Sequence, residues 1–336
     1  MRTNLKLDIK DKKILKELFR DGRIPFSLVA KKVGMSKEVV NYRVNKMLER
    51  GLLLGFNSVY DVKRIGWKIY MVYLKLKSID NKREQEIINT LKSHKNVAWV
   101  IKCIGYYDII IKIFARESHE YNHTIKEIES LIGLSLSDYD SDAAEREHPV
   151  QIPFLYAPVN PDRHEDIRKE GDFKISNIDI SILEELAHDA RMPLSDMASK
   201  LSVSRDLLKY HLKKLEEELI ILKYRPSAWS GSKSLGFSWY LISLKLRQLE
   251  TEKQMTLFSY IANHPNVTYF YELTGEHDFG FEIRIKTGDE LNDVMMQIRS
   301  ILGEDLKSHI LNLILKEYKY TYFPDCLKET IKTTQH

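Results

Sequence analysis

Two short stretches of the chain carry the side-chain types that contact nucleic acid. The first stretch has five of them at spacings typical of one side of a helix: Lys37, Asn41, Tyr42, Arg43 and Lys46. Lysine and arginine pair with phosphate oxygens or with guanine, and asparagine bridges the edge of adenine in a major groove wide enough for a helix. The pattern predicts a DNA-binding helix. A basic face is also common on solvated helices that bind nothing, so that alternative stays open.

The second stretch repeats the basic face less strongly. Its candidate DNA contacts are Arg205, Lys209, Tyr210 and His211. His211 stands where the first stretch has an arginine, and three consecutive glutamates follow at 216–218. A helix with fewer cations neutralises fewer phosphates and binds less tightly. We expect this helix to bind DNA weakly, to contact a different half-site, or only to dock.

A glycine and an aspartate three residues apart occur twice, each time ahead of a strand-like run. The two runs are GYYDIII at 105–111 and GEHDFGF at 275–281. Glycine tolerates the positive φ of a hairpin, and aspartate can bond neighbouring backbone amides, so a structural turn explains the motif. An exposed aspartate there could equally hold the ammonium group of a small ligand. The candidate effector-binding residues are Gly105, Asp108, Gly275, His277 and Asp278.

Two stretches of the chain partly match metal-binding patterns, but neither predicts a metal site. The stretch His119–His123 matches the zinc pattern H-E-x-x-H, in which two imidazoles one turn apart hold the metal. The repeat of this stretch has Asp289 and Asp293 in place of the histidines. An acidic run at 138–149 lacks the glycine that a calcium loop requires. We therefore expect no metal, no cofactor and no catalytic residue, and the chain is not expected to be an enzyme.

These candidate residues belong to an internal duplication. With a shift of 168 residues, the segment 11–56 aligns with 179–224 without a gap. With a shift of 170 the similarity continues, so that Gly66 and Gly133 fall on Gly236 and Gly303. Self-similarity at a fixed spacing indicates repeated structural units. Each copy spans about 150 residues, with a proline-containing, charged linker at 149–172 between them.

The front third of each copy is helical in period. Apolar residues three and four apart predict three short helices, with a turn at Gly34 and a helix cap at Ser36. This is the helix-turn-helix pattern, and Leu52–Phe56 is a possible wing strand. We expect helix-turn-helix domains at 1–60 and 173–228.

The rear of each copy alternates strands and helices in the order expected for a ferredoxin-like βαββαβ domain. These domains are predicted at 61–148 and 229–325, which makes the chain an α+β protein with four domains. The strand at Lys68–Lys77 is apolar on both faces, so two sheets are expected to stack through their apolar faces. The last strand of the first copy, LSLSDYDSDAAERE, is acidic, and we expect it to be solvated and irregular.

Composition limits the class of protein. The chain has 336 residues, of which 43% are hydrophobic and 30% charged, and its net charge is +4. No apolar run approaches the roughly 20 residues of a spanning helix, and the first ten residues hold no apolar signal region. We expect a cytoplasmic protein that does not bind membranes. Its two cysteines, Cys103 and Cys326, exclude a disulfide framework and a four-cysteine zinc site.

The motifs, taken in this order, resemble those of the Lrp/AsnC (feast/famine) transcription regulators. Asp21-Gly22-Arg23, Ser36 and Arg43-Val44 resemble the DNA-binding domain of that family, and the Gly-x-x-Asp hairpin resembles its ligand-sensing (RAM) domain. The resemblance implies a reader of double-stranded DNA, sensing domains that pair through their sheets, and small effectors such as amino acids near the hairpins. Two fused copies would form a pseudo-dimer within one chain, which is also expected to form a homo-oligomer.

Two other functions remain open at this point. Siroheme decarboxylases of haem biosynthesis are similar in fold and can be tandem fusions. Their His-Cys-Tyr-x-Arg stretch corresponds here to a segment around Tyr269, Tyr271 and Leu273, which has neither the histidine nor the arginine. A small-molecule sensor that no longer binds DNA is the third possibility, and the acidic second helix-turn-helix favours it.

Overall fold

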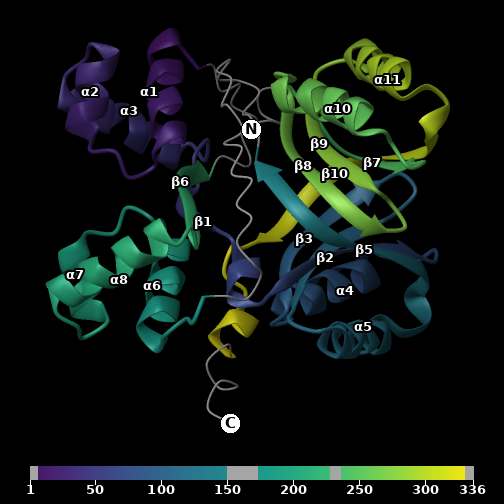
Figure 1. Cartoon of the computed structure of the whole chain (residues 1–336), viewed down its shortest axis with the longest axis horizontal. Helices are drawn as coiled ribbons and strands as arrows, with labels where there is room; N and C mark the ends of the chain where they lie inside the picture. The colour runs from purple at the N-terminus through teal and green to yellow at the C-terminus, as the bar shows by residue number, and fades with distance from the viewer. Residues whose placement is uncertain (1–6, 150–172, 228–235, 330–336) are drawn as a thin grey trace. The chain divides into compact units, whose positions relative to one another are not determined.

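The computed structural model describes residues 7–149, 173–227 and 236–329 (Figure 1). These residues form two compact units, each built from both copies. The first unit, here called the reader unit, holds residues 7–67, 173–227 and 321–329. The second, the barrel unit, holds 68–149 and 236–320. The linker predicted at 149–172 lies outside the described residues except for Pro149, which ends a strand.

The reader unit contains two trihelical domains. The first is made of α1 (Ile9–Arg20), α2 (Phe26–Val33) and α3 (Lys37–Glu49), and the second of α6 (Asn177–His188), α7 (Leu194–Lys200) and α8 (Arg205–Glu217). Both α1 and α6 begin with a capping box. In each, the cap residue and the residue three positions later accept, through their side chains, from each other's backbone amides. The predicted apolar stripes form the two cores, because Ile14, Leu18, Val40 and Val44 are fully buried. The helix-turn-helix prediction is confirmed.

The turn between the second and third helices has the same left-handed shape in both copies. Gly34 has a φ of 69°, and Ser202, which occupies the matching place, has a φ of 54°. Glycine adopts this conformation freely, whereas a side chain with a Cβ is strained in it. The second copy therefore keeps the backbone of the turn at a cost that the first copy avoids.

Two strands join the trihelical domains. Strand β1 (Gly55–Tyr60) pairs antiparallel with β6 (Ile221–Ser227), so that the predicted wing strand begins at Gly55. Each strand also contacts the first helix of the other copy. The Tyr60 hydroxyl donates to the Leu183 carbonyl at 2.6 Å, and the Gly22 amide donates to the Tyr224 carbonyl at 2.8 Å. A Cβ on Gly22 would lie 2.7 Å from the Arg225 nitrogen, so glycine is needed there for close approach. Short helical turns η1 (Val62–Ile65) and η4 (Asp325–Glu329) complete the unit.

The barrel unit contains the two predicted ferredoxin-like domains. The elements from the first copy are β2 (Lys68–Leu76), α4 (Asn81–Ser93), β3 (Val97–Ile104), β4 (Ile109–Ala115), α5 (Ser118–Ile132), η2 (Gly133–Ser135) and β5 (Leu136–Pro149). Those from the second copy are β7 (Ser238–Leu246), α10 (Thr251–Asn263), β8 (Val267–Gly275), β9 (Phe279–Ile285), α11 (Gly288–Leu302), η3 (Gly303–Asp305) and β10 (Leu306–Tyr320). The α+β class and the element order are as predicted.

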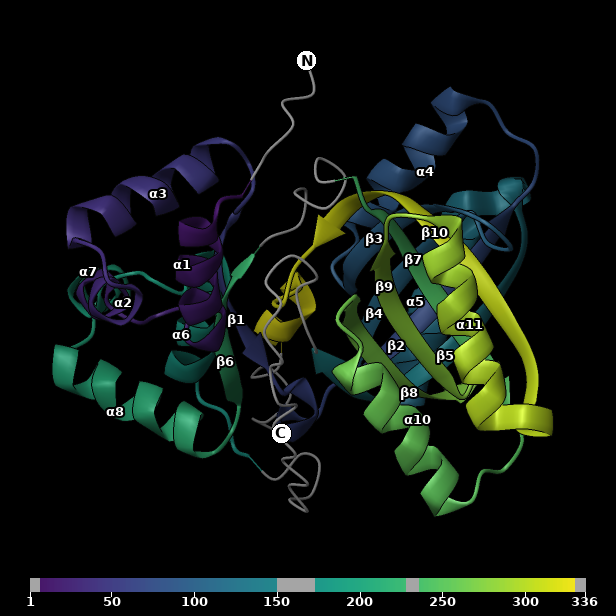
Figure 2. The same cartoon turned by 90° about the horizontal axis from the view of Figure 1, so that it is seen from above.

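The two sheets are joined edge to edge. The strands close into a barrel in the order β10-β3-β4-β2-β5-β8-β9-β7 (Figure 2). Strand β5 pairs with β2 of its own copy and with β8 of the other, and β10 pairs with β7 and with β3. The expectation of two sheets stacked through apolar faces is corrected: the strands form one closed barrel, because each final strand pairs with strands of both copies.

The acidic strand at the end of the first copy was expected to be solvated and irregular, but it pairs along both edges. Residues Leu136–Pro149 form one strand, whose register shifts once on each edge. Its acidic residues on the inward face have partners, since Asp140, Asp142 and Glu147 accept from Tyr107, His277 and Lys112. Strand preference depends on cross-strand neighbours more than on residue type, which explains why composition misled here.

The strands bury both faces, as the sequence pattern predicts. One face packs under helices and is purely apolar: Val72, Leu74, Ile111 and Ile113 lie under α4 and α5 in the first copy. Because successive side chains alternate across a strand, Tyr73 and Lys112 point into the barrel instead.

One end of the barrel interior holds a cluster of buried charges. Lys112 pairs with Glu147, and its ammonium lies 5.4 Å from the Trp99 ring centroid. Burial raises the pKa of Glu282, which accepts from the Trp239 indole at 3.1 Å. Burial raises the pKa of Glu317 to about 8, although the Trp99 indole donates to it at 2.7 Å. With a pKa of about 8, the Glu317 carboxyl group is mostly protonated at neutral pH.

The strained turn of the second copy yields a prediction about stability. We expect Ser202→Gly to raise the free energy of unfolding by about 1 kcal/mol, because glycine removes the strain of the left-handed backbone. The reverse change, Gly34→Ser, should lower it by a similar amount. A Cβ at position 34 meets nothing within 4 Å, so the effect there is conformational only. Urea unfolding followed by circular dichroism measures both, and destabilisation by Ser202→Gly would contradict the argument.

Half-buried Glu317, with its raised pKa, predicts how stability depends on pH. In the folded barrel, burial raises the pKa of the Glu317 carboxyl group to about 8 from its ordinary value of 4.5. The folded state therefore binds more protons than the unfolded state between these values, so the free energy of unfolding falls as pH rises through this window, by at most about 1.4 kcal/mol per pH unit.

The charges that act on Glu317 are those of Glu282, Arg284 and Lys112. We expect Glu317→Gln to flatten the pH dependence of urea unfolding, followed by tryptophan fluorescence from pH 5 to 8. Exposed Glu304→Gln is the control and should leave the slope unchanged. An equally steep slope in Glu317→Gln would show that this carboxyl group is not the cause.

Candidate nucleic-acid interface and effector hairpins

Helix α3 presents a polar and aromatic face to solvent. The Ser36 hydroxyl accepts from the Val39 amide at 3.3 Å and so caps the helix as predicted. Val40, Val44 and Met47 are buried, while Lys37, Asn41 and Tyr42 are exposed. The Tyr42 ring keeps 61% of its surface in solvent, an unusual position for a large aromatic group. Lys46 is half-buried beside it, with its ammonium 3.3 Å from the Tyr42 hydroxyl.

Helix α8 presents the same arrangement. The Ser204 hydroxyl caps it by accepting from the Leu207 amide at 3.2 Å. Arg205, Lys209 and Tyr210 are exposed, and Tyr210 keeps 63% of its surface in solvent. In Figure 2, α3 and α8 run along two edges of the reader unit, separated by the shorter helices. The two faces share a frame but differ in side chains.

Arg43 and His211 have surroundings different from those expected from the sequence. The Arg43 guanidinium bonds Asp8 at 2.8 Å and Asp11 at 2.7 Å, and only 23% of the side chain is exposed. His211 occupies the matching place and bonds Asp179 at 2.7 Å. The reason is geometric: position 43 lies three and four residues from buried positions 40 and 47, so it borders the apolar stripe. Both side chains tie the third helix to the cap of the first.

The three glutamates after α8's basic face have protein partners. Glu216 accepts from the Tyr224 hydroxyl at 2.5 Å, Glu217 pairs with Lys213 at 3.3 Å, and Glu218 pairs with Arg64 at 3.5 Å. These glutamates lie at the carboxyl end of the helix, and Arg205 lies at the opposite end. Their charge still lowers the positive potential around the helix, because exposed pairs are screened only partly.

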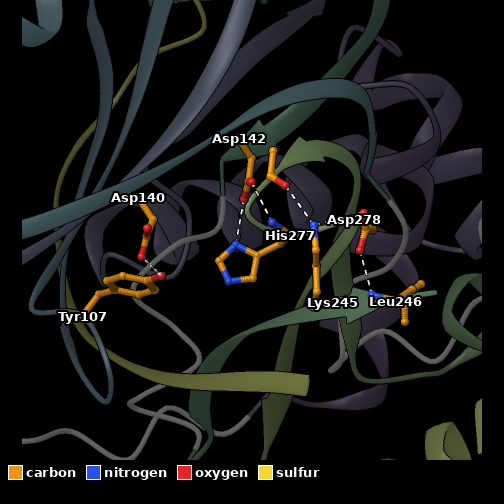
Figure 3. A network of polar contacts seen from close by, with 8 residues as sticks. Tyr107, Asp140, Asp142, Lys245, Leu246, His277 and Asp278 are labelled. Carbon is orange, nitrogen blue, oxygen red and sulfur yellow. Dashed lines mark hydrogen bonds and ion pairs between the residues drawn. The ribbon is translucent and has the colours of Figure 1, made fainter. Parts of the chain in front are cut away.

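The aspartates of the two Gly-x-x-Asp motifs hold their hairpins to neighbouring strands. One oxygen of Asp108 accepts from the Leu76 amide at 2.7 Å, and one oxygen of Asp278 accepts from the Leu246 amide at 2.7 Å. In the second copy, the Lys245 ammonium also lies 3.4 Å from Asp278 (Figure 3). The structural explanation of the aspartates thus has direct support in both copies.

The glycines of the motifs let each hairpin lie against the last strand of the other copy. A Cβ on Gly105 would lie 2.7 Å from the Asn312 side-chain oxygen, and one on Gly275 would lie 2.5 Å from the Ser141 carbonyl. Contacts this short are not available to a side chain, so the motif requires glycine for close approach. Each hairpin is therefore completed by a strand from the opposite half.

A buried histidine–aspartate pair lies under the second hairpin. His277 bonds Asp142 twice, through its backbone amide at 2.8 Å and its Nδ1 at 2.8 Å (Figure 3). Both residues are almost completely buried. In the first hairpin Tyr107 takes the matching place, donating its amide to Asn312 at 3.2 Å and its hydroxyl to Asp140 at 2.5 Å. Tyr107 and His277 thus fill equivalent places with different chemistry.

Sequence reasoning identified His277 but missed its partner Asp142, and it missed Asn312, the partner of Tyr107. A signal existed, because the shift of 170 residues that aligns the hairpins also aligns these two positions. Among the described residues, His277 Nε2 and Asn312 Nδ2 are buried without a hydrogen-bond partner. Buried polar atoms usually have one, so these atoms are candidates for contact with water or a polar ligand.

The H-E-x-x-H stretch opens helix α5 at the surface. His119 and His123 are largely exposed and lie beside Glu117 and Glu127 at 3.2 and 3.4 Å. Within the ranges the structure describes, no group of three or more histidine, cysteine, aspartate or glutamate side chains could hold a metal ion. Over the same ranges, the helices are too short or too polar to cross a membrane.

Comparison with known proteins matches both trihelical domains. A model of the winged helix-turn-helix DNA-binding family matches residues 7–53 and 175–218. The HTH-type transcriptional regulator FL11 of Pyrococcus horikoshii is 28% identical over 128 residues, which are 38% of this chain and 83% of the regulator. The regulatory protein AsnC of Haemophilus influenzae is 29% identical over 135 residues, 40% of this chain and 84% of AsnC. Each relative thus corresponds to less than half of the chain.

A solved structure extends the likeness to nearly the whole chain. The siroheme decarboxylase NirDL aligns with a TM-score of 0.62 over 98% of this chain and all of that one. Its sequence identity is 16%, so the likeness establishes the fold and not the activity. Together, the winged-helix matches in both halves, the AsnC-type relatives and this fold fit a tandem Lrp/AsnC unit. The winged-helix matches and the relatives also support a DNA-binding transcription regulator.

Proposed function

We propose that the chain is a sequence-specific regulator that reads duplex DNA through α3 and α8 and responds to a small polar effector. The observation that carries this proposal is the pair of capped helices whose solvent faces both combine cations with an exposed tyrosine, to which α3 adds asparagine amides. A helix that only covers a core has no need to expose Tyr42 and Tyr210 in the same place. The regulator names of the relatives support the same function.

The residues of α3 and α8 take separate roles in this proposal. Lys37, Lys46 and Arg205 are placed to pair with phosphates or guanine, and Asn41 with adenine. Arg43 and His211 act indirectly, because their contacts with Asp11 and Asp179 hold the third helix against the first. Replacing Arg43 should therefore lower the stability of the domain more than it changes the recognition of bases.

The effector is proposed to bind at the hairpins of the barrel unit. The unpartnered His277 Nε2 and Asn312 Nδ2 support this location, since each lies beside one Gly-x-x-Asp hairpin. An amino acid is the effector class that the AsnC-type relatives suggest. Asp108 and Asp278 each use one carboxylate oxygen for the strand, and their role toward a ligand remains part of the proposal. Association of whole chains into a homo-oligomer belongs to it as well.

The DNA-binding function predicts the effect of removing one cation. We expect Lys37→Ala to weaken binding to duplex DNA about 5- to 10-fold and to reduce the slope of log affinity against log salt by about 1. Fluorescence anisotropy of a labelled duplex at several salt concentrations measures both quantities. Lys126→Ala removes the same charge from an exposed site on α5 and should change neither.

The result that would reject a DNA-binding function is the absence of salt-dependent binding to any duplex at low ionic strength. Equal losses in Lys37→Ala and Lys126→Ala would instead show that net charge, and not the face of α3, determines affinity.

The effector site predicts a ligand-dependent rise in stability. Binding at 100 times the dissociation constant should stabilise the folded chain by about 2.7 kcal/mol. We expect at least one amino acid, screened singly, to raise the melting temperature by several degrees. The variant His277→Phe should lose this response, whereas Glu276→Gln, exposed on the same hairpin, should keep it. If no amino acid changes the melting temperature or the DNA affinity, the effector class is wrong.

A further inference from the structure

The two recognition helices are held in equivalent frames. Both begin at a serine cap, follow a left-handed turn residue and bury three apolar side chains. They also expose the same two kinds of apolar group at matching positions. Val39 and Leu207 each keep 40% of their surface in solvent, and Tyr42 and Tyr210 keep 61% and 63%. Any difference in DNA recognition must therefore come from the polar side chains between them.

Those polar side chains differ at matching exposed positions. Asn41 of α3 corresponds to Lys209 of α8, and one turn later Asn45 corresponds to Lys213. An asparagine amide both donates and accepts, which suits the N6 and N7 groups of adenine. A lysine ammonium only donates, which suits the O6 and N7 acceptors of guanine. The first copy thus presents adenine-type groups where the second presents guanine-type groups.

The surrounding charge differs in the same direction. Residues 31–50 contain six lysines and arginines and two acids, whereas the matching residues 199–218 contain five and four. Phosphate contacts supply most of the salt-dependent affinity. The half-site under α3 should therefore contribute more of the affinity than the half-site under α8.

Each chain carries one helix of each kind, because α3 and α8 belong to the two copies within one polypeptide. The pairing of β1 with β6 joins the two domains that hold these helices. The palindromic operators of dimeric helix-turn-helix proteins mirror the identity of their two subunits. That identity is absent here. We infer that one chain recognises a DNA site without dyad symmetry, with adenine read by Asn41 in one half and guanine read by Lys209 in the other.

This inference rests on the proposed DNA-binding function and concerns its target. Its test is selection of bound sequences from random duplexes long enough for one chain, about two turns of DNA. The expected result is a motif whose two halves differ, with an adenine that α3 requires. Changing that adenine to guanine should lower the affinity of the unaltered chain about 5- to 100-fold.

Exchange of the two side chains makes the test specific. Asn41→Lys should shift the selected motif toward two guanine-type halves, and Lys209→Asn toward two adenine-type halves. Both positions are exposed, so neither change disturbs a core. Asn122→Lys, the same change at an exposed position of α5, is the matched control and should leave the motif unaltered.

The outcomes separate the inference from the function on which it rests. Selection of no sequence at all would reject the DNA-binding function. A palindromic motif, or an unsymmetrical motif that Asn41→Lys and Lys209→Asn leave unaltered, would overturn the inference while the regulator function stands.

Discussion

The exchange of strands between the two copies is the constraint on which the structure depends. In the barrel unit, β5 and β10 each pair with a strand of their own copy and with one of the other. In the reader unit, β1 and β6 pair with each other and contact the opposite first helix. Neither copy could complete its sheet, its hairpin or its wing by itself, because the missing backbone partners come from the other copy. The two similar sequences therefore fold into units to which both copies contribute strands.

Duplication also allowed the paired positions to diverge. A symmetric dimer must place the same residue on both sides of its axis, whereas here Tyr107 faces Asn312 and His277 faces Asp142. The barrel interior shows the same freedom at its charged end, where Lys112 in one copy corresponds to Glu282 in the other. Such combinations need two different halves, since a buried charge is tolerated only beside a suitable partner.

Much of this architecture could be predicted from the sequence, because it depends on periodicity and repetition. The trihelical domains, the Ser36 cap and the order of strands follow from local patterns that the structure confirms. What could not be predicted depends on contacts between distant residues. The pairing of β5 along both edges comes from partners on β2 and β8, and the inward turn of Arg43 comes from the acids that cap α1. The candidate DNA face was predicted in the same way as the helices. The repeat aligns Asp142 with Asn312, but only the placement of the strands shows that these two residues contact the hairpins.

Closure of the barrel inside one polypeptide has a consequence for a protein present in few molecules. A dimer of separate subunits falls apart on dilution below its dissociation constant, and its exposed strand edges are then free to aggregate. Here the joining of halves is intramolecular, with an effective concentration in the millimolar range that dilution does not lower. The two trihelical domains that hold α3 and α8 therefore stay together even when a single molecule of the protein is present on a genome.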